Sequence, residues 1–293
     1  MCSKVHYSNR AFFSEGKVIL VTGASSGIGR AVCLSLAKYH PKLVIFARRR
    51  SQLLKTAKLL EQLKIEVLPI VGDIRNREDR EKLVDFAIKR FGRIDVLINN
   101  AGLGKANLFL EQPETEIDQL IETNLLALIK MTKQVLPIMK RQESGMVINM
   151  SSSLALLPVY PFAVYCATKS AVKIFSDSIR QEFKKYGISV STVMPGPYDT
   201  NFNKVAGLDT SKVPAYQVDK LANSIAKLII RPKKDLICPK SYSVLVWFTE
   251  RFKTIKNFLT FQIAQMIDKG RLNKLIEEKA EETKIKLVVN KKK

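Results

Sequence analysis

Between Lys17 and about Gly196, short apolar runs alternate with longer stretches in which apolar residues recur with helical period. The runs are rich in β-branched residues and predict buried strands at Val18–Val21, Leu43–Ala47, Val67–Val71, Val96–Asn99, Val147–Met150 and Ser189–Met194. The stretches between them predict helices at Ile28–Tyr39, Gln52–Leu63, Arg77–Phe91, Ile117–Lys140 and Ala163–Tyr186. Apolar strands separated by helices are typical of an α/β protein, in which a doubly wound parallel sheet is covered on both faces.

The alternation loosens after Pro195. Turn formers predict a loop first, and the residues that follow predict a helix, an edge strand and two lysine-rich helices, at Gly196–Pro214, Tyr216–Ile230, Leu236–Cys238, Ser243–Ile267 and Arg271–Lys286. No linker or internal repeat interrupts the alternating region. We therefore expect one domain over residues 15–240, preceded by a tail (residues 1–14) and followed by a basic, amphipathic helical extension (residues 241–293).

The chain is strongly basic. Its 49 Lys and Arg residues against 27 Asp and Glu residues give a formal net charge of +22, and half of this excess lies between Lys212 and Lys293. Such a balance is typical of proteins that meet a phosphorylated cofactor, nucleic acid or an anionic membrane, although a solvated basic face explains it equally well. No zinc-finger, helix-turn-helix or RNA-binding motif is present, so we expect no nucleic-acid partner.

The four cysteines are widely spaced and the chain has two histidines, so neither a disulfide framework nor a metal site is expected. The N-terminal residues lack the apolar core of a signal peptide, and no apolar run reaches the length of a membrane span. We therefore expect a cytoplasmic protein that is not secreted, with peripheral attachment to a membrane as the alternative.

A glycine-rich turn follows the first expected strand and opens the first expected helix. Glycine allows a tight turn and a close approach of the backbone to a ligand, and the free N–H groups of a helix N-terminus bind phosphate. In the first βαβ unit this arrangement predicts a Rossmann-type dinucleotide-binding fold. The residues expected to bind the dinucleotide here are Thr22, Gly23, Ser25, Ser26, Gly27, Ile28 and Gly29.

The end of the second expected strand indicates which dinucleotide is bound. Sheets of this type that bind NAD usually carry an acidic residue there, which accepts hydrogen bonds from the ribose. Here the strand ends in Phe46-Ala47-Arg48-Arg49-Arg50, without a carboxylate. Arg48 can pair with the 2′-phosphate of NADP(H), whereas Arg49 or Arg50 fits the solvated first turn of the next helix. We therefore predict NADP(H) as the cofactor.

Four motifs follow one another along the chain: Thr22-Gly23-x₃-Gly27-x-Gly29, Asn99-Asn100-Ala101-Gly102, Tyr165-x₃-Lys169 and Pro195-Gly196. Together they resemble the short-chain dehydrogenase/reductase (SDR) family over about residues 15–240, and the joint match is far more specific than any one motif. The resemblance implies an oxidoreductase that interconverts a carbonyl group and an alcohol. With the cofactor predicted above, this favours NADPH-dependent reduction of a ketone or aldehyde.

The resemblance also implies a catalytic group. Tyr165 and Lys169 are four residues apart and share a helix face, where the ammonium is expected to lower the phenol pKa from its usual value of about 10. Ser152 matches the family's serine, which hydrogen-bonds the substrate oxygen, and Asn124 matches the asparagine that anchors a proton relay. NADPH then gives hydride to the carbonyl carbon while Tyr165 gives a proton to the oxygen.

Further cofactor contacts are implied by the same match, at Asp73, Ile74, Asn100, Ala101, Gly102, Tyr165, Lys169, Pro195, Gly196 and Thr200. Asp73 corresponds to the residue that hydrogen-bonds the adenine amino group, and Thr200 to one that bonds the nicotinamide carboxamide. Ser151 and Ser153, which flank Ser152, are expected to serve as strand-end and turn residues.

The substrate side of the expected site is apolar, with Leu154, Leu156, Leu157, Val159, Tyr160 and Phe162. These residues favour a hydrophobic ketone or aldehyde, although they suit a core or a subunit contact equally well. Many relatives have glycine where this chain has Ala155, so we expect a differently shaped substrate loop. Relatives also pair through their long helices, which implies a homodimer or homotetramer here.

Two other hypotheses remain. Residues 242–266 interleave aromatic and basic side chains, which is typical of a segment that lies in a lipid headgroup layer, and packing on protein is the alternative. At a membrane the substrate would be a lipid carbonyl: a keto-acyl chain, a keto-sphingoid base or a steroid. A catalytically silent NADP(H)-binding sensor is the third hypothesis, which the presence of both Tyr165 and Lys169 disfavours.

Overall fold

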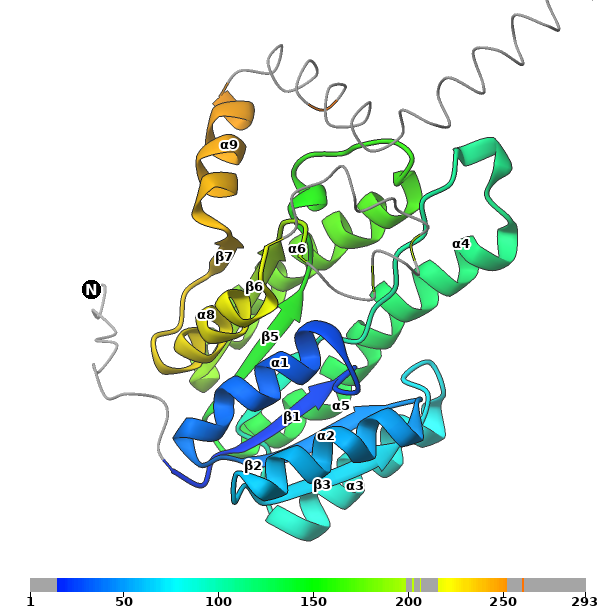
Figure 1. The fold of residues 1–293 in the computed structure, drawn as a ribbon. Helices are drawn as coiled ribbons and strands as arrows, with labels where there is room; N and C mark the ends of the chain where they lie inside the picture. Colours follow the sequence, from blue (N-terminus) through cyan, green and yellow to red (C-terminus); the bar gives the residue numbers. More distant parts are fainter. Residues whose placement is uncertain (1–14, 199–201, 203–205, 207–215, 252–259, 261–293) are drawn as a thin grey trace, which may run out of the picture.

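The computed structural model describes residues 15–198, 202, 206, 216–251 and 260 (Figure 1). In this part of the chain, one parallel seven-stranded sheet has the order β3-β2-β1-β4-β5-β6-β7. Its strands are β1 (Val18–Thr22), β2 (Lys42–Ala47), β3 (Val67–Val71), β4 (Val96–Asn99), β5 (Gly145–Met150), β6 (Ile188–Pro195) and β7 (Asp235–Cys238). The chain forms a single Rossmann-type domain, so the expected fold class is confirmed.

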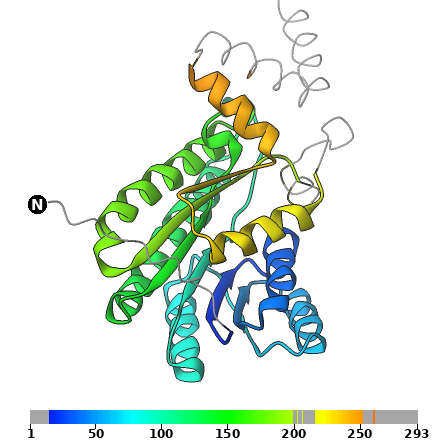
Figure 2. The ribbon, with the colours of Figure 1, turned by 90° about the vertical axis from the view of Figure 1, so that its left-hand side faces the viewer.

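Helices cover both faces of the sheet (Figures 1 and 2). They are α1 (Gly27–Leu36), α2 (Arg50–Gln62), α3 (Arg77–Phe91), α4 (Glu114–Ile121), α5 (Ala127–Arg141), α6 (Ala163–Phe183), α8 (Val218–Ile230) and α9 (Lys240–Arg251). Alternate side chains of a strand point to opposite faces. Ile19 and Val21 accordingly pack with α1, α2 and α8, whereas Val18 and Leu20 pack with α3, α5 and α6.

The sheet order places a crevice beside the end of β1. All five residues of β1 are buried, because the strand is covered on both faces and paired on both edges, with β2 and with β4. The strands β2 and β3 lie on one side of β1, and β4 begins the other side of the sheet. The strand order therefore reverses between β1 and β4. Ligands of open α/β sheets bind at such a point, beyond the carboxyl ends of the strands.

The single long helix expected over Ile117–Lys140 is interrupted. α4 begins earlier, at Glu114, and a π-helical turn, Glu122–Leu126, joins it to α5. Apolar periodicity did not reveal the turn, because one extra residue in a helix changes which side chains face inward without removing the apolar pattern. In this turn the neighbours Thr123 and Asn124 are both buried.

The C-terminal part is described only in its first portion. α9 follows β7 directly, so the helix expected at Ser243–Ile267 begins at Lys240. Its part beyond Arg251 (residue 260 excepted), the expected helix Arg271–Lys286, most of the loop Gly196–Pro214 and the tail of residues 1–14 lie outside the described residues, so the expected domain limits stay a prediction. Within the described residues, no helix combines the length and the apolar character that crossing a membrane requires.

Candidate active site

Hydrogen bonds join the turn after β1 to the turn after β4. The Thr22 hydroxyl accepts from the backbone N–H groups of Asn100 and Ala101, both at 3.0 Å, and donates to the Ile98 carbonyl at 3.3 Å. The Asn100 side chain returns a hydrogen bond to the Thr22 carbonyl at 2.9 Å. Thr22 is 1% exposed and its hydroxyl bonds these three groups, so this buried side chain links the two turns.

The glycines of the turn allow this contact. Gly23 has a φ of +71°, and a Cβ there would lie 2.8 Å from Asn100 Nδ2 and 2.9 Å from Ala101 Cα. A Cβ at Gly29 would overlap the Gly23 carbonyl oxygen. Only glycine fits these two positions without displacing backbone. The N-terminus of α1 therefore meets the edge of the sheet closely, with its free N–H groups in the crevice.

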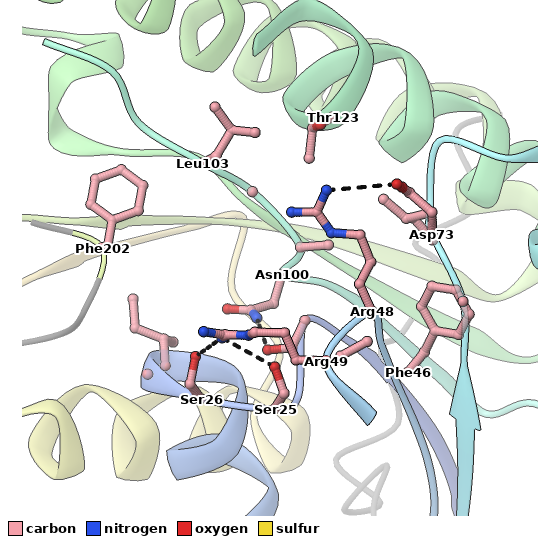
Figure 3. A pocket seen from close by; sticks show the side chains of 18 residues that line it. Ser25, Ser26, Phe46, Arg48, Arg49, Asp73, Asn100, Leu103, Thr123 and Phe202 are labelled. Atoms are coloured by element: carbon pink, nitrogen blue, oxygen red, sulfur yellow. Dashed lines mark hydrogen bonds and ion pairs between the residues drawn. The ribbon is translucent and has the colours of Figure 1, made fainter. Parts of the chain in front are cut away.

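A cavity of about 290 Å³ opens at this edge (Figure 3), near the lower end of the range for ligand pockets. The expected cofactor residues that line it are Gly23, Ser25, Ser26, Gly27, Ile28, Arg48, Asp73, Ile74, Asn100, Ala101 and Gly102. Those outside its lining are Thr22, Gly29, Tyr165, Lys169, Pro195 and Gly196, and Thr200 lies outside the described residues. Residues that no motif marked also line it: Phe46, Ala47, Arg49, Gly72, Leu103, Thr123 and Phe202.

Two arginines after β2 reach the cavity in different directions (Figure 3). Arg48 extends toward Asp73, with its Nη1 3.6 Å from Asp73 Oδ2. Arg49 is exposed, as the sequence indicated, yet its Nη2 donates to Ser25 Oγ at 3.2 Å and to Ser26 Oγ. The Arg49 guanidinium therefore lies over the glycine-rich turn, and both positive charges border the cavity.

Asp73 is held as a carboxylate. Partial burial opposes its ionisation, but hydrogen bonds from Arg75 and the charge of Arg48 keep the pKa of Asp73 below its usual range. Arg75 Nη2 lies 2.8 Å from Asp73 Oδ2, and Arg75 Nη1 lies 3.7 Å from Glu122 Oε2. Arg75 thus connects the loop after β3 to the π-helical turn.

The expected catalytic residues of α6 meet the end of β5. Lys169 Nζ donates to the Met150 carbonyl at 2.9 Å and lies 5.7 Å from the centre of the Tyr165 ring. The Ser152 side chain hydrogen-bonds the Tyr165 phenol and also accepts from the Leu154 N–H at 3.1 Å. Ser152, Tyr165 and Lys169 are all buried. Ser152, which follows β5, thereby forms one group with Tyr165 and Lys169 of α6.

Asn124 lies beside this group on the π-helical turn. Its amide accepts from the Leu103 N–H and donates to the Leu103 carbonyl, both at 2.9 Å, which ties the turn to the chain that follows β4. A Cβ at Gly102 would lie 3.2 Å from Asn124 Oδ1 and 3.5 Å from Lys169 Nζ. Gly102 therefore adjoins both side chains and puts no bulk between them.

Burial controls the protonation of the pair on α6. It lowers the pKa of Lys169 to about 8. It also raises the pKa of Tyr165, and the hydrogen bond from Ser152 offsets this only in part. The expectation that Lys169 would lower the phenol pKa is therefore wrong for this arrangement, because the ammonium is directed at the Met150 carbonyl. Tyr165 is a neutral phenol at neutral pH, which is the form that can donate a proton.

Apolar side chains pack on the Tyr165 ring. The Tyr165 ring meets Phe162 edge-on at 5.9 Å between ring centres, and Phe202 at 5.7 Å. The cluster around it also includes Ala106, Leu120, Cys166 and Ala206, with Leu103, Leu154 and Val164 packed against it. Of the six apolar residues that the sequence placed here, only Leu154 and Phe162 belong to this cluster. No motif of the sequence marks Phe202.

Pro195 and Gly196, at the end of β6, lie close to the start of α9. The Gly196 N–H donates to the Cys238 carbonyl at 2.7 Å, and a Cβ at Gly196 would lie 3.3 Å from Pro239 and 3.4 Å from the Tyr242 ring. This glycine therefore allows the end of β6 to pack closely against the chain after β7. In the described part of the chain, no cluster of His, Cys, Asp and Glu residues is suited to hold a metal ion.

Comparisons with known proteins agree with this architecture. The family model for short chain dehydrogenase matches residues 17–210. The ketoacyl reductase HetN of Nostoc sp. is 33% identical over 231 residues, which cover 76% of this chain and 78% of that protein. The human dehydrogenase/reductase SDR family member 7 is 30% identical over 271 residues, covering 82% and 79%. A solved short-chain dehydrogenase from Sphingobium yanoikuyae, in complex with NADPH, has a TM-score of 0.73 at 27% identity and covers 81% and 95%.

A doubly wound sheet with a glycine-rich turn at its switch point defines a dinucleotide-binding class of protein. Within that class the chain belongs to the short-chain dehydrogenase/reductase family. It is therefore an oxidoreductase of a family that acts on alcohol and carbonyl groups with a nicotinamide cofactor.

Thr22→Val should destabilise the protein. The variant keeps the shape of the side chain but leaves the N–H groups of Asn100 and Ala101 without their acceptor, at a cost of about 1–3 kcal/mol per buried group. We expect the melting temperature measured by calorimetry to fall by several degrees. Thr22→Ser, which keeps the hydroxyl, should stay near the wild type. An unchanged melting temperature in T22V would contradict the role of this hydroxyl as the link.

Proposed function

We propose that this protein is an NADPH-dependent reductase that converts a hydrophobic ketone or aldehyde into an alcohol. The observation that carries the proposal is the buried group of Ser152, Tyr165 and Lys169, next to a cavity that a glycine-rich turn and two arginines border. When bound, NADPH supplies the hydride that is added to the carbonyl carbon.

The chain's own residues handle the proton and orient the substrate. Tyr165, as a neutral phenol, donates its proton to the carbonyl oxygen. Ser152 hydrogen-bonds both that oxygen and the phenol, so it stabilises the negative charge that develops on oxygen. Lys169, with a pKa of about 8, returns a proton to the tyrosine from a group that exchanges readily near neutral pH. Asn124 positions the chain at Leu103 beside them.

The preference for NADPH rests on charge. Arg48 and Arg49 bring two guanidinium groups to the end of β2, which carries no carboxylate of its own; Asp73, after β3, pairs with Arg48 at 3.6 Å. The N-terminus of α1 suits the pyrophosphate and Asp73 suits the adenine amino group. Ser25 and Ser26 orient the Arg49 guanidinium before any ligand arrives. The NADPH complex of the Sphingobium relative supports the same choice.

The apolar surroundings of Tyr165 support a hydrophobic substrate. Apart from Lys169, whose ammonium lies 5.7 Å from the ring centre, the described contacts of the ring are with aliphatic and aromatic side chains and Cys166. The printed name of the Nostoc relative, a ketoacyl reductase, is consistent with a carbonyl on an apolar chain. Oligomers formed through α5 and α6 belong to the same proposal, and the exposed Ile174 of α6 suits such a contact. Membrane contact through residues 242–266 and a cytoplasmic location stay predictions.

Tyr165→Phe should abolish turnover and leave cofactor binding intact. The variant removes only the proton donor, so NADPH oxidation against a panel of hydrophobic ketones should slow by about 10²–10⁴-fold. NADPH affinity, measured by fluorescence titration, should stay near that of the wild type. Tyr186→Phe removes the same group from the 3-10 turn that follows α6, Lys184–Tyr186, and should keep full activity. Undiminished turnover in Y165F would contradict the proposed role.

Arg48→Asp and Arg49→Asp should each weaken NADPH binding by about tenfold or more, because a charge-assisted contact becomes a repulsion. NADH lacks the 2′-phosphate, so its dissociation constant should change little. Arg50→Asp is the matched control, since Arg50 is exposed and does not line the cavity. Equal losses for both cofactors in either variant would count against that arginine as the phosphate ligand.

The reductive rate should fall as pH rises through about 8. Lys169 is charged below its pKa, and above it the site loses the ammonium that resupplies Tyr165. The quantity to measure is kcat/KM for NADPH against pH, which reports groups of the free enzyme. Lys169→Arg, which stays charged, should remove this alkaline limb in whatever activity it retains. A wild-type profile that stays flat across the alkaline range would exclude Lys169 as the titrating group.

A further inference from the structure

Two serine hydroxyls link α6 to β5, which lies beside it in the fold (Figure 1). Ser151, directly after β5, donates from its Oγ to the backbone carbonyl of Lys169 at 2.7 Å. Farther along α6, Ser176 Oγ accepts from Asn149 Nδ2 at 2.9 Å. Asn149 and Ser151 are two residues apart, so they point to the same face of the sheet. Lys169 and Ser176 are about two helical turns apart, so the two hydrogen bonds act at separate points of one contact.

The hydrogen bond of Ser151 starts from a fixed point and is not needed to form the helix. Ser151 is 4% exposed, and its N–H donates to the Val193 carbonyl of β6 at 2.8 Å, so the sheet holds its backbone. A carbonyl inside an α-helix accepts from the N–H four residues later and has a second lone pair to offer. The Ser151 hydroxyl occupies this second place on Lys169. The bond therefore fixes where α6 lies on β5, whereas the helix itself forms without it.

Three consecutive residues at the end of β5 each bind one group of the pair on α6. The Met150 carbonyl accepts from the Lys169 ammonium at 2.9 Å, and the Ser151 hydroxyl donates to the Lys169 carbonyl. The Ser152 side chain hydrogen-bonds the Tyr165 phenol. Lys169 is thus bound to this segment both by its backbone and by the end of its side chain. The backbone bond sets the point from which the side chain extends, and hence whether the ammonium reaches the Met150 carbonyl.

The hydrogen bond of Ser176 belongs to a buried network between the two helices that flank this part of the sheet. Asn99 Nδ2 donates to Asn149 Oδ1 and to Thr132 Oγ1, both at 2.9 Å. Ser176 in turn donates to the Val172 carbonyl at 2.7 Å. The network thus runs from α5 through β4 and β5 to α6, and such satisfied buried networks make packing rigid. None of its bonds involves a catalytic residue.

We propose that Ser151 is a positioning residue for the reaction, whose hydroxyl fixes the Lys169 backbone against the end of β5 and so holds the ammonium and the Tyr165 phenol in place for proton transfer. This inference rests on the proposed function. It gives Ser151, which the sequence marked only as a strand-end or turn residue, a role that acts through Lys169. The bond between Asn149 and Ser176, two helical turns away, serves stability alone.

The test compares Ser151→Ala with Ser176→Ala in the full chain, since each variant removes one hydroxyl that links α6 to β5. In S151A, kcat at saturating NADPH and ketone should fall by about 10- to 100-fold, because a small displacement of the reacting groups slows the transfer. In S176A, kcat should stay near that of the wild type. The melting temperature should fall no further in S151A than in S176A, because the Lys169 carbonyl keeps its helical partner whereas the Asn149 amide loses its acceptor.

The pH profile gives a readout that a loss of stability alone would not move. The Met150 carbonyl offsets part of the cost of the buried ammonium, so an ammonium displaced from it should lose its proton more readily. The alkaline limb of kcat/KM should therefore move to lower pH by about one unit in S151A and stay in place in S176A. Ser153→Ala removes a neighbouring buried hydroxyl that has no hydrogen bond to α6 among the described residues, and it should change neither kcat nor the limb.

Each outcome decides between the roles. Wild-type kcat in S151A, or an alkaline limb that stays in place, would overturn the assignment of Ser151 and leave the proposed function standing. Equal losses of kcat and of melting temperature in S151A and S176A would identify the Ser151 hydroxyl as structural and overturn the assignment as well. A wild type that binds NADPH but reduces no ketone or aldehyde would overturn the proposed function, and the assignment with it.

Discussion

The close contact between the turn after β1 and the turn after β4 organises the whole carboxyl edge of the sheet. The Thr22 hydroxyl and the Asn100 amide hold the two turns together, and Gly23 and Gly29 let the backbones approach where a Cβ would collide. This contact sets the N-terminus of α1 against the chain that leads on to Leu103 and Asn124. Residues of both turns, among them Gly23 and Asn100, line the cavity.

The buried ammonium of Lys169 is the main electrostatic cost of the site. Its pKa of about 8, below the usual 10.5, means that the unfolded chain binds this proton more tightly than the native protein does. Burying the charge therefore opposes folding below about pH 8, and this opposition disappears above the unfolded pKa. One carbonyl, that of Met150, compensates part of the cost. A charge kept under such conditions is typical of a functional site, since packing alone would favour an apolar residue there.

The π-helical turn links the two halves of the candidate site. From this one turn, Asn124 is bonded to the chain beside Lys169, while Thr123 lines the cavity near Asp73. The ion pairs of Arg75 connect the same turn to the loop after β3. One local feature of the backbone thus joins a wall of the cavity to the neighbourhood of Lys169, so a shift of the turn would affect both.

Several features follow from the sequence by itself. Continuous apolar runs that alternate with stretches of helical period are typical of the buried strands of a covered parallel sheet, so the fold class was predictable. Tyr165, Lys169 and Ser152 were predicted through the resemblance of the motifs to the short-chain dehydrogenase/reductase family, and the spacing of Tyr165 and Lys169 adds that they share a helix face.

Only the tertiary structure decided the rest. Arg49 borders the cavity because Ser25 and Ser26, far from it in the chain, bind its guanidinium. Thr123 lines the cavity from a π-helical turn, and the Phe202 ring packs on Tyr165. Tyr165 is a neutral phenol because the fold buries it, and burial raises its pKa. Local patterns determine which element a residue belongs to, whereas contacts between distant segments determine its partners, its solvent exposure and hence its pKa.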